Sequence, residues 1–155
     1  MSLTNSPKLD SANLILRGPE IRDFEPIALF YADAPRAAGF GGSLKRGDAW
    51  RWFASNIGHW QIHGYGYFTI EIKTAQIAGM SEVWNPEGWP EPEVSWIVYP
   101  GFDVRSIAYE AAVTARQWAY EKLSMTTLTS NFIPGITRSI KLTKRMGAKY
   151  ERSYI

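Results

Sequence analysis

The residues best placed for chemistry run from an apolar strand into a long helix, over positions 93–112 of the chain. A strand, a Pro100-Gly101 break and a helix start follow one another with almost nothing between them. This order is typical of a sheet that delivers a helix N-terminus to an anionic ligand. Ser106 lies near the helix start, where a serine either contacts a phosphate or caps the helix. We therefore expect the functional site in this stretch.

Residue counts argue against two other kinds of site. The chain has no cysteine, which excludes a disulfide scaffold, a thiolate metal site and a cysteine nucleophile. Its histidines, His59 and His63, are four residues apart and could face one way on a helix. No carboxylate or third histidine has a matching spacing, so we expect no metal site and a partly exposed histidine pair instead.

Composition and charge describe an ordinary globular protein. The 155 residues are 45% hydrophobic and 21% charged, and we expect a single domain over residues 1–155. A net charge of +2 is too small and too scattered to make nucleic acid the expected partner. No signal peptide or long apolar run is present, so the sequence predicts a soluble, cytoplasmic protein with no membrane partner.

Apolar spacing and breaker residues predict the elements that must position the site. Strands are predicted from alternation or β-branched content at residues 13–17, 67–72, 77–84, 93–99, 126–132 and 148–154. Helices are predicted from a cap at Asp23 to Ala32, from a cap at Asp48 to a stop at Gly64, and over 105–123 and 137–146. Prolines and glycines in 34–47 predict a short helix or turn followed by a mobile loop.

The resulting order is β, α, α, β, β, β, α, β, α, β. It predicts a mixed α/β (α+β) domain in which helices flank a mostly antiparallel sheet. The strands 67–72 and 77–84 form a hairpin, and the Pro-rich residues 85–92 form a loop that leads into the strand 93–99. The second half contains a strand-helix-strand crossover.

This order of elements resembles the GNAT superfamily of N-acetyltransferases, and within it the branch that includes ribosomal-protein N-terminal acetyltransferases. The resemblance runs over nearly the whole chain, from the strand 13–17 to the closing helix and strand at 145–150. Between them, residues 93–100 resemble the family's fourth strand, 107–111 the start of its long helix and 134–142 its late helix. The resemblance implies a GNAT-like fold, with acetyl-CoA as cosubstrate and an amine as acceptor.

In this family, the loop between the fourth strand and the long helix has the pattern Gln/Arg, two residues, Gly, one residue, Gly/Ala. Its backbone N–H groups hold the cofactor pyrophosphate. Here Gly101 takes the first position, and Val104 and Ser106 take the two glycine positions. A β-branched residue in a left-handed conformation costs about 1–2 kcal/mol. We therefore expect a shifted loop or weakened cofactor binding, with Arg105 offsetting part of the loss through a charge-assisted phosphate contact.

The resemblance also implies the other cofactor contacts. The family often has Asn, two residues, Ser on its late helix; here Ile136 replaces the asparagine and Ser139 matches the serine. A backbone N–H near Val98 is the implied oxyanion donor, because the family splays its fourth and fifth strands, and Asn131 either contacts the pantetheine arm or makes a turn. The complete set of implied cofactor contacts is Val98, Val104, Arg105, Ser106, Ile107, Ala108, Asn131 and Ser139.

Acetyl transfer from a thioester to an amine needs a base for the amine, an oxyanion stabiliser and a proton for the departing thiolate. Glu93 matches a glutamate that the family often carries, so it is the implied base, directly or through water; the alternative is a solvated charge at a strand end. Ser139 is the implied proton donor to the thiolate, or else it bonds the helix backbone. Trp84 and Trp89 flank the loop 85–92 and form an acceptor pocket or pack that loop.

Two functions of different classes follow. The first is an acetyl-CoA-dependent N-acetyltransferase that works by direct attack of a primary amine, on a protein N-terminus or a small molecule, in a ternary complex. The second is a GNAT-fold binding or interaction module with a weakened or lost CoA site, motivated by Val104, Ser106 and Ile136. A homodimer is compatible with either. An aromatic-lined RNA binder is a third interpretation that rests only on the Trp and Tyr content and the charge.

Overall fold

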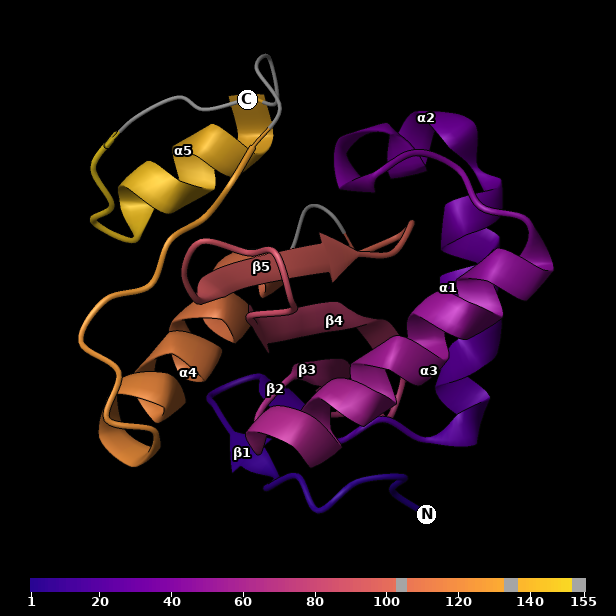
Figure 1. Ribbon diagram of the computed structural model, residues 1–155, viewed down its shortest axis with the longest axis horizontal. Coiled ribbons are helices and arrows are strands. Elements are labelled where there is room, and N and C mark those ends of the chain that lie inside the picture. The colour runs from indigo at the N-terminus through magenta and orange to yellow at the C-terminus, as the bar shows by residue number, and fades with distance from the viewer. Residues whose placement is uncertain (103–105, 133–136, 152–155) are drawn as a thin grey trace.

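The computed structural model of the protein describes residues 1–102, 106–132 and 137–151 and shows a central sheet with helices on both faces (Figure 1). Five antiparallel strands form this sheet in the order of the chain. They are β1 (Leu9–Asp10), β2 (Leu14–Arg17), β3 (Tyr67–Ile72), β4 (Ile77–Trp84) and β5 (Glu93–Val98). The expected hairpin is β3–β4, and the short β1 was not anticipated by the sequence.

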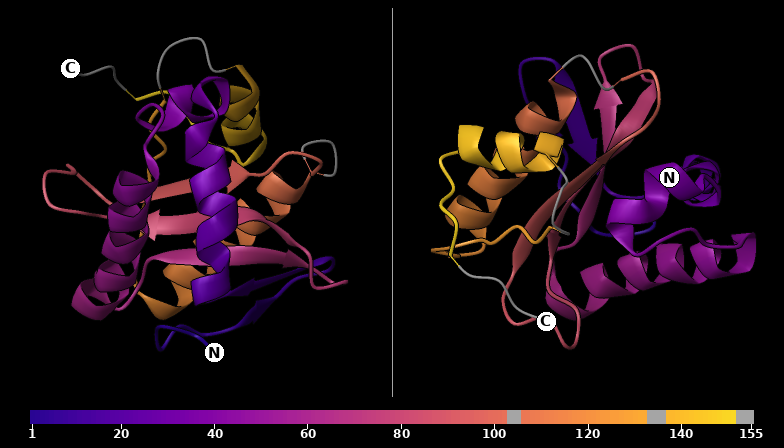
Figure 2. Two further views of the ribbon diagram at one scale, coloured as in Figure 1. Left: turned by 90° about the vertical axis from the view of Figure 1, so that its right-hand side faces the viewer. Right: turned by 90° about the horizontal axis from the view of Figure 1, so that it is seen from above.

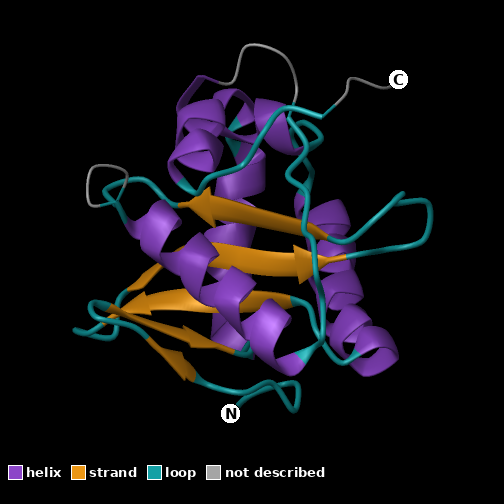
Figure 3. Ribbon diagram, turned by 90° about the vertical axis from the view of Figure 1, so that its left-hand side faces the viewer, coloured by secondary structure: helices purple, strands orange, loops and turns teal. Residues whose placement is uncertain are grey.

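The helices divide between the two faces of the sheet. On one face lie α1 (Phe24–Ala32) and α3 (Arg46–His63), with α2 (Ala34–Ala37) and the 3-10 turn η2 (Ala38–Phe40) between them (Figure 2). On the other face α4 (Ile107–Lys122) crosses the strands, and α5 (Thr137–Arg145) lies next to it, beyond β5 (Figure 3). A further 3-10 turn, η1 (Ile21–Asp23), precedes α1.

Small side chains let α4 pack closely on the sheet. Ala111, Ala112, Ala115 and Ala119 are fully buried, as the apolar stripe predicted. The strands contribute alternate residues to the two faces, so Phe68 packs with α4 whereas its neighbours face α1 and α3. α4 therefore packs tightly on the sheet, and this packing fixes where its N-terminus lies relative to β5.

Gly79 allows β4 and β5 to pair closely. A Cβ atom at this position would lie 2.1 Å from the carbonyl oxygen of Ile97, which is a forbidden contact with backbone. The register places Gly79 opposite Val98 and Met80 opposite Ile97. The absence of a side chain at Gly79 thus helps fix the position of the second half of β5.

Two expected helix caps differ from the structure. The helix expected to start at Asp48 begins at Arg46, with Lys45 as its N-cap residue, while its stop at Gly64 is confirmed by a φ of 76°. Asp48 lies in the first turn, where an acidic residue is also favoured by the helix dipole, and accepts a bond of 3.1 Å from Arg51. Asp23 is the N-cap residue of α1, but its side chain does not cap the helix. It is buried and paired with Arg17 at 2.8 Å.

Two strands predicted from the sequence are not found in the described residues. Residues 126–132 form no strand, and their backbone pairs with β5 only at one isolated parallel bridge, between Glu93 and Thr129. Residues 148–151 are not in a strand either, and residues 152–154 lie outside the described part of the chain. Strand pairing depends on a partner elsewhere in the chain, so β-branched content alone was a weak guide.

No helix within the described ranges combines the length and apolar character needed to cross a membrane.

Candidate functional site

The outer edge of β5 leaves backbone groups available for a ligand. The Val94 N–H donates to the carbonyl of Thr129 at 2.8 Å, on the side of β5 that faces away from β4. Hydrogen bonding alternates along an antiparallel strand, and Tyr99 N–H bonds to Ala78 of the inner neighbour at 2.8 Å. The N–H groups of Trp96 and Val98 therefore face outward, past the point where the chain after α4 has separated from β5.

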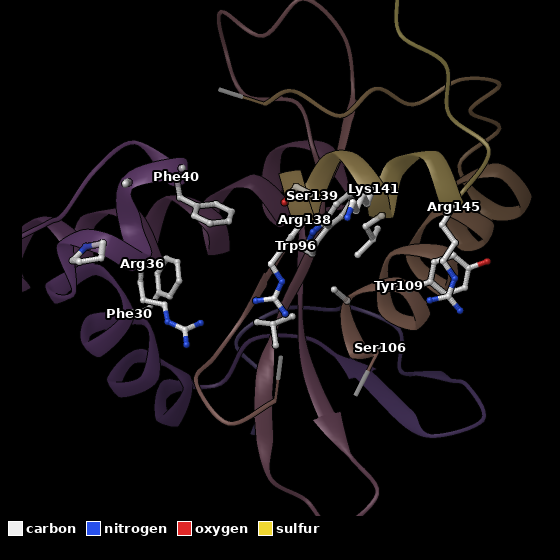
Figure 4. Close-up of a pocket in the computed structure, with 16 residues that line it drawn as sticks. Phe30, Arg36, Phe40, Trp96, Ser106, Tyr109, Arg138, Ser139, Lys141 and Arg145 are labelled. Carbon is white, nitrogen blue, oxygen red and sulfur yellow. The ribbon is translucent and has the colours of Figure 1, made fainter. Parts of the chain in front are cut away.

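A cavity of about 650 Å³ lies at this open edge, above the second half of β5 and between α2 and α5 (Figure 4). Its floor includes Trp96 and Val98 of β5, and the start of α4 completes one end. The lining residues from the helices are Phe30, Pro35, Arg36, Ala38, Gly39, Phe40, Ser106, Ala108, Tyr109, Arg138, Ser139, Lys141, Leu142 and Arg145.

The two walls of the cavity differ in character. The α1–α2 wall is aromatic, with Phe30 packed edge-on against Phe40 at 5.5 Å between ring centroids, and carries Arg36. The α5 wall presents Arg138, Lys141 and Arg145 on the opposite side (Figure 4). The described lining contains these four cationic side chains and no carboxylate, so the cavity favours an anionic ligand.

The α4 end of the cavity keeps a left-handed residue at one of the expected glycine positions. Ser106 has a φ of 55° and a ψ of 23° and is the N-cap residue of α4, but its side chain makes no capping hydrogen bond. The backbone conformation that glycine would adopt is thus present with a serine in place. The N-terminus of a 16-residue helix opens beside it, with N–H groups and a dipole suited to phosphate.

Arg145 is held against the end of α4 by an aromatic contact. Its guanidinium lies 3.9 Å from the centroid of the Tyr109 ring, and both side chains line the cavity (Figure 4). A cation over an aromatic face is attracted by the ring quadrupole. This contact connects α4 to α5 and keeps a positive charge beside the helix N-terminus.

The structure brings together four of the residues expected to contact the cofactor. Val98, Ser106, Ala108 and Ser139 all line the cavity, although they come from β5, α4 and α5. The side chain of Ile107 is buried in the core beneath α4, so its backbone alone can face the site. Val104 and Arg105, together with Ile136, lie outside the described residues.

Glu93 and Asn131 do not line this cavity but are bonded to one another. One carboxylate oxygen of Glu93 accepts from the backbone N–H of Asn131 at 2.8 Å and from its side-chain amide at 2.7 Å. Glu93 is 6% exposed, and burial raises the pKa of its carboxyl group while the donors from Asn131 and Trp89 oppose that rise. Its environment is a buried, hydrogen-bonded one instead of a solvated strand end.

Trp84 ends β4 opposite Glu93, the first residue of β5, and Trp89 lies in the loop before β5; neither lines the cavity at the second half of β5. Trp84 is stacked on His59 with 4.5 Å between ring centroids, and Trp89 is 42% exposed. The expectation of a partly exposed histidine pair is wrong for His59, which is buried; His63 is exposed. His59 contacts the carbonyl of Tyr65 at 2.7 Å and accepts from the Asn85 N–H at 3.0 Å, which anchors the loop 85–92.

Sequence reasoning missed the residues that give the cavity its charge and its aromatic wall. Arg138 and Lys141 sit three residues apart on α5, a spacing that places them on one face and could have been read from the sequence. Arg36 and Phe40 carried no such signal, because only the fold brings α2 opposite α5. Within the described ranges, no three histidine or acidic side chains gather closely enough to hold a metal ion.

The donor set fits coenzyme A. An elongated ligand with several phosphates matches a cavity that combines a helix N-terminus, cationic side chains on α5 and outward-facing N–H groups on β5.

Comparison with known proteins agrees with this geometry. The family model described as "Acetyltransferase (GNAT) domain" matches residues 13–149. A crystal structure of the acetyltransferase from Agrobacterium tumefaciens strain C58 is 32% identical in sequence, with a TM-score of 0.87 over 92% of this chain and 84% of that one.

More distant structures share the fold. A putative ribosomal-protein-serine acetyltransferase from Vibrio cholerae is 16% identical, with a TM-score of 0.74 over 96% of this chain and 87% of that one. The ribosomal L7/L12 α-N-protein acetyltransferase RimL, solved in complex with coenzyme A, is 12% identical, with a TM-score of 0.74 over 90% of this chain and 82% of that one.

Proposed function

The chain belongs to the GNAT acetyltransferase family, and from that premise we propose that it transfers the acetyl group of acetyl-CoA to a primary amine by direct attack in a ternary complex. The observation that carries the proposal is the cationic cavity at the open outer edge of β5. In this cavity a thioester held at β5 is accessible to an acceptor from the α1–α2 side. The acetyl thioester supplies the electrophile.

The residues that hold the cofactor are assigned to the α4–α5 side of the cavity. The N-terminus of α4, with Ser106, binds the pyrophosphate, and Arg138 and Lys141 contribute charge-assisted contacts to anionic groups. Arg145, positioned by Tyr109, adds a third cation. The outward N–H groups of β5, as far as Val98, would hold the pantetheine arm.

The backbone of β5 stabilises the developing oxyanion. The N–H of Val98, or that of Trp96 two residues earlier, faces the cavity and donates to the carbonyl oxygen as its negative charge grows. A donor fixed by the strand needs no reorganisation during the reaction. This assignment rests on the direction of the strand's hydrogen bonds and on the residues that line the cavity.

Proton transfer is assigned to Glu93 and Ser139. The amine loses a proton to Glu93, directly or through water, its nitrogen forms a bond to the carbonyl carbon, and the carbon–sulfur bond breaks. Ser139, which lines the cavity on α5, donates a proton to the leaving thiolate and regains one from solvent. The raised pKa of the Glu93 carboxyl group makes it a better proton acceptor than a solvated glutamate.

Acceptor selectivity is assigned to the segments 34–47 and 85–92. The first contributes α2 and η2, including Arg36 and Phe40, to the cavity wall, and the second carries Trp89 near Glu93. The acceptor is a protein N-terminus or a small-molecule amine. Trp84 and Trp89 remain predictions for contacts with the distal part of that acceptor.

Calorimetric titration with acetyl-CoA, followed by a free-thiol assay over a panel of amines, tests the proposal. We expect binding heat, and thiol release that depends on the amine. The alternative of a GNAT-fold binding module predicts binding of some ligand with no amine-dependent thiol release. The absence of both heat and thiol release would overturn the acetyltransferase proposal.

A further inference from the structure

Glu82 is a buried carboxyl group that the described residues leave without a hydrogen-bond donor or a cationic partner. It lies on β4, is 6% exposed, and is opposite Ser95 of β5. A carboxyl group that is largely buried and has no donors is unfavourable in its charged form, because that form loses most of its hydration and no described side chain replaces it. Such a group calls for an explanation beyond packing.

Glu93 lies on the same face of the sheet, one diagonal step away. The register pairs Glu82 with Ser95 and Trp84 with Glu93, and directly opposed residues of antiparallel strands point to the same face. The two carboxyl groups nevertheless have different environments. Glu93 accepts hydrogen bonds from Asn131 and Trp89, whereas Glu82 accepts none from the described residues.

The electrostatic surroundings of Glu82 favour its neutral form. Burial raises the pKa of the Glu82 carboxyl group to about 8, and the carboxylate of Glu93 is the second cause. The other titratable groups that couple to Glu82 are the hydroxyls of Tyr31 on α1, Tyr67 on β3 and Tyr99 after β5. None of these is a cation, so no described group offsets the cost of a second negative charge beside Glu93.

We propose that Glu82 and Glu93 form a two-carboxyl pair that takes up the proton of the acceptor amine, with Glu93 facing the acceptor and Glu82 storing the proton. Glu82 thereby acts through Glu93 as a positioning residue. This inference rests on the proposed function, since it assigns a partner to the base of that reaction.

The protons of the acceptor ammonium leave the nitrogen in two steps. The acceptor ammonium gives one proton to the doubly ionised pair, and the free amine forms its bond to the carbonyl carbon. As the carbon–sulfur bond breaks, the nitrogen releases its second proton to solvent, and the departing thiolate takes a proton from Ser139, which regains one from solvent. The pair, now holding one proton, returns it to solvent and regains its double charge. A base is most effective when its pKa is close to the operating pH, and an α-amine also titrates near about 8. The pair is matched to such an acceptor better than a solvated glutamate would be.

Glu82 and Glu93 lie on the sheet face opposite to the one that carries the Trp96 side chain, next to the strand that borders the cavity. Ser95, the cross-strand partner of Glu82, immediately precedes Trp96, whose side chain lines the cavity and whose N–H faces outward. Glu93 lies two residues before Ser95 on the same strand face. Both carboxyl groups therefore lie on the α1–α3 face of the sheet. β5, which carries Glu93, borders the cavity with its outer edge.

A titration that needs no activity tests the pair directly. Carbon-13 NMR of protein labelled at the glutamate side-chain carboxyl, with the Glu82 signal assigned from Glu82→Gln, gives the pKa of Glu82 in the wild type and in Glu93→Gln. We expect a wild-type value near 8 and a decrease of at least one pH unit in Glu93→Gln. An ordinary glutamate value, or no change in Glu93→Gln, overturns the pairing even if the enzyme is active.

The pH dependence of kcat/KM tests the role of the Glu82–Glu93 pair in catalysis. Measuring it with two acceptor amines of different pKa separates the titration of the enzyme from that of the amine. We expect Glu82→Gln to move the acidic limb at least one pH unit lower and to reduce the rate at pH 9 about tenfold, with an unchanged KM for acetyl-CoA. Glu82→Asp should restore most of the wild-type profile, and Glu121→Gln, at an exposed position of α4 that does not line the cavity, should match the wild type. An unshifted limb in a folded Glu82→Gln protein overturns the proposed role. If no amine is acetylated by the wild type, it is the proposed function that fails, and the NMR result still stands.

Discussion

The N–H of Val94 donates to the carbonyl of Thr129 at 2.8 Å, and beyond this contact no backbone hydrogen bond joins β5 to the described residues after α4. After this contact the chain stays beside β5 through side chains, such as the Phe132 ring whose centroid lies 6.2 Å from that of Trp96, but its backbone does not pair with the strand. The outward N–H groups of Trp96 and Val98 consequently border a cavity where a neighbouring strand would otherwise have paired with them. The site exists because strand pairing stops early.

Removing the outward donor of Val98 should slow catalysis without unfolding the sheet. Val98→Pro removes an N–H that takes no part in pairing with β4, and proline is tolerated at such an edge position. We expect kcat to fall about 10²- to 10³-fold, the effect of losing one oxyanion donor. Val98→Ala keeps the N–H and serves as the control. A Val98→Pro enzyme as fast as Val98→Ala would show that another group binds the oxyanion.

The cations of α5 should control cofactor affinity. Arg138→Gln and Lys141→Gln are each expected to raise the Kd for CoA about tenfold, about 1.4 kcal/mol, because each removes a charge-assisted contact. Isothermal titration at two salt concentrations measures this effect and should show weaker salt dependence in the variants. Lys144→Gln changes an exposed cation of α5 that does not line the cavity and should leave Kd unchanged. Equal Kd values for all three variants would contradict the assignment.

The hydroxyl of Ser139 should matter for the chemical step more than for binding. We expect Ser139→Ala to lower kcat about 10²-fold, the lower end of the range for a general acid, with little change in KM for acetyl-CoA. Pre-steady-state thiol release measures this step. Thr143→Val, one turn away, removes a hydroxyl that bonds to the Ser139 carbonyl and serves as a control for effects on the helix itself. Should both variants lose activity equally, the role of Ser139 would be structural.

The left-handed conformation of Ser106 should limit what can replace it. Ser106→Val places a β-branched side chain at a φ of 55°, which we expect to reduce the free energy of unfolding by about 1–2 kcal/mol and to weaken CoA binding. Ser106→Gly relieves the strain and should bind CoA at least as tightly as the wild type. Denaturant unfolding and CoA titration of both variants check this. Tighter CoA binding by the valine variant would contradict it.

The stability of the protein should depend on the charge of Glu82. Below about pH 4.5 the folded and unfolded states both keep this proton, and between about 4.5 and 8 only the folded state does. The wild type should therefore lose a few kcal/mol relative to Glu82→Gln as pH rises through this range, with no further difference above it. Urea unfolding at pH 5, 7 and 9 measures the difference. Parallel stability curves for the two proteins would show that Glu82 ionises as easily in the folded state as in the unfolded one.

Local chemistry was enough to predict most elements. The alternation in 67–72 and 77–84 predicted the β3–β4 hairpin, the alanine stripe predicted α4, and Gly64 ended α3 as expected. These features depend on residues within one or two turns of each other. The start of α3 was misplaced because an acidic residue is favoured both at an N-cap and in the first turn, and Asp48 occupies the second of these positions.

The sequence by itself predicted the mostly antiparallel sheet and the long helix after β5, and its resemblance to the GNAT family implied that Val98, Ser106, Ala108 and Ser139 contact one ligand. Only the tertiary structure decided that the backbone of residues 126–132 pairs with β5 at a single bridge, that α2 faces α5 across the cavity, and that Glu82 lies beside Glu93 with no donor among the described residues. The physical reason is range. Propensity and periodicity act over a few neighbouring residues, whereas strand separation, cavity walls and carboxyl coupling depend on segments that meet only when the whole sheet has formed.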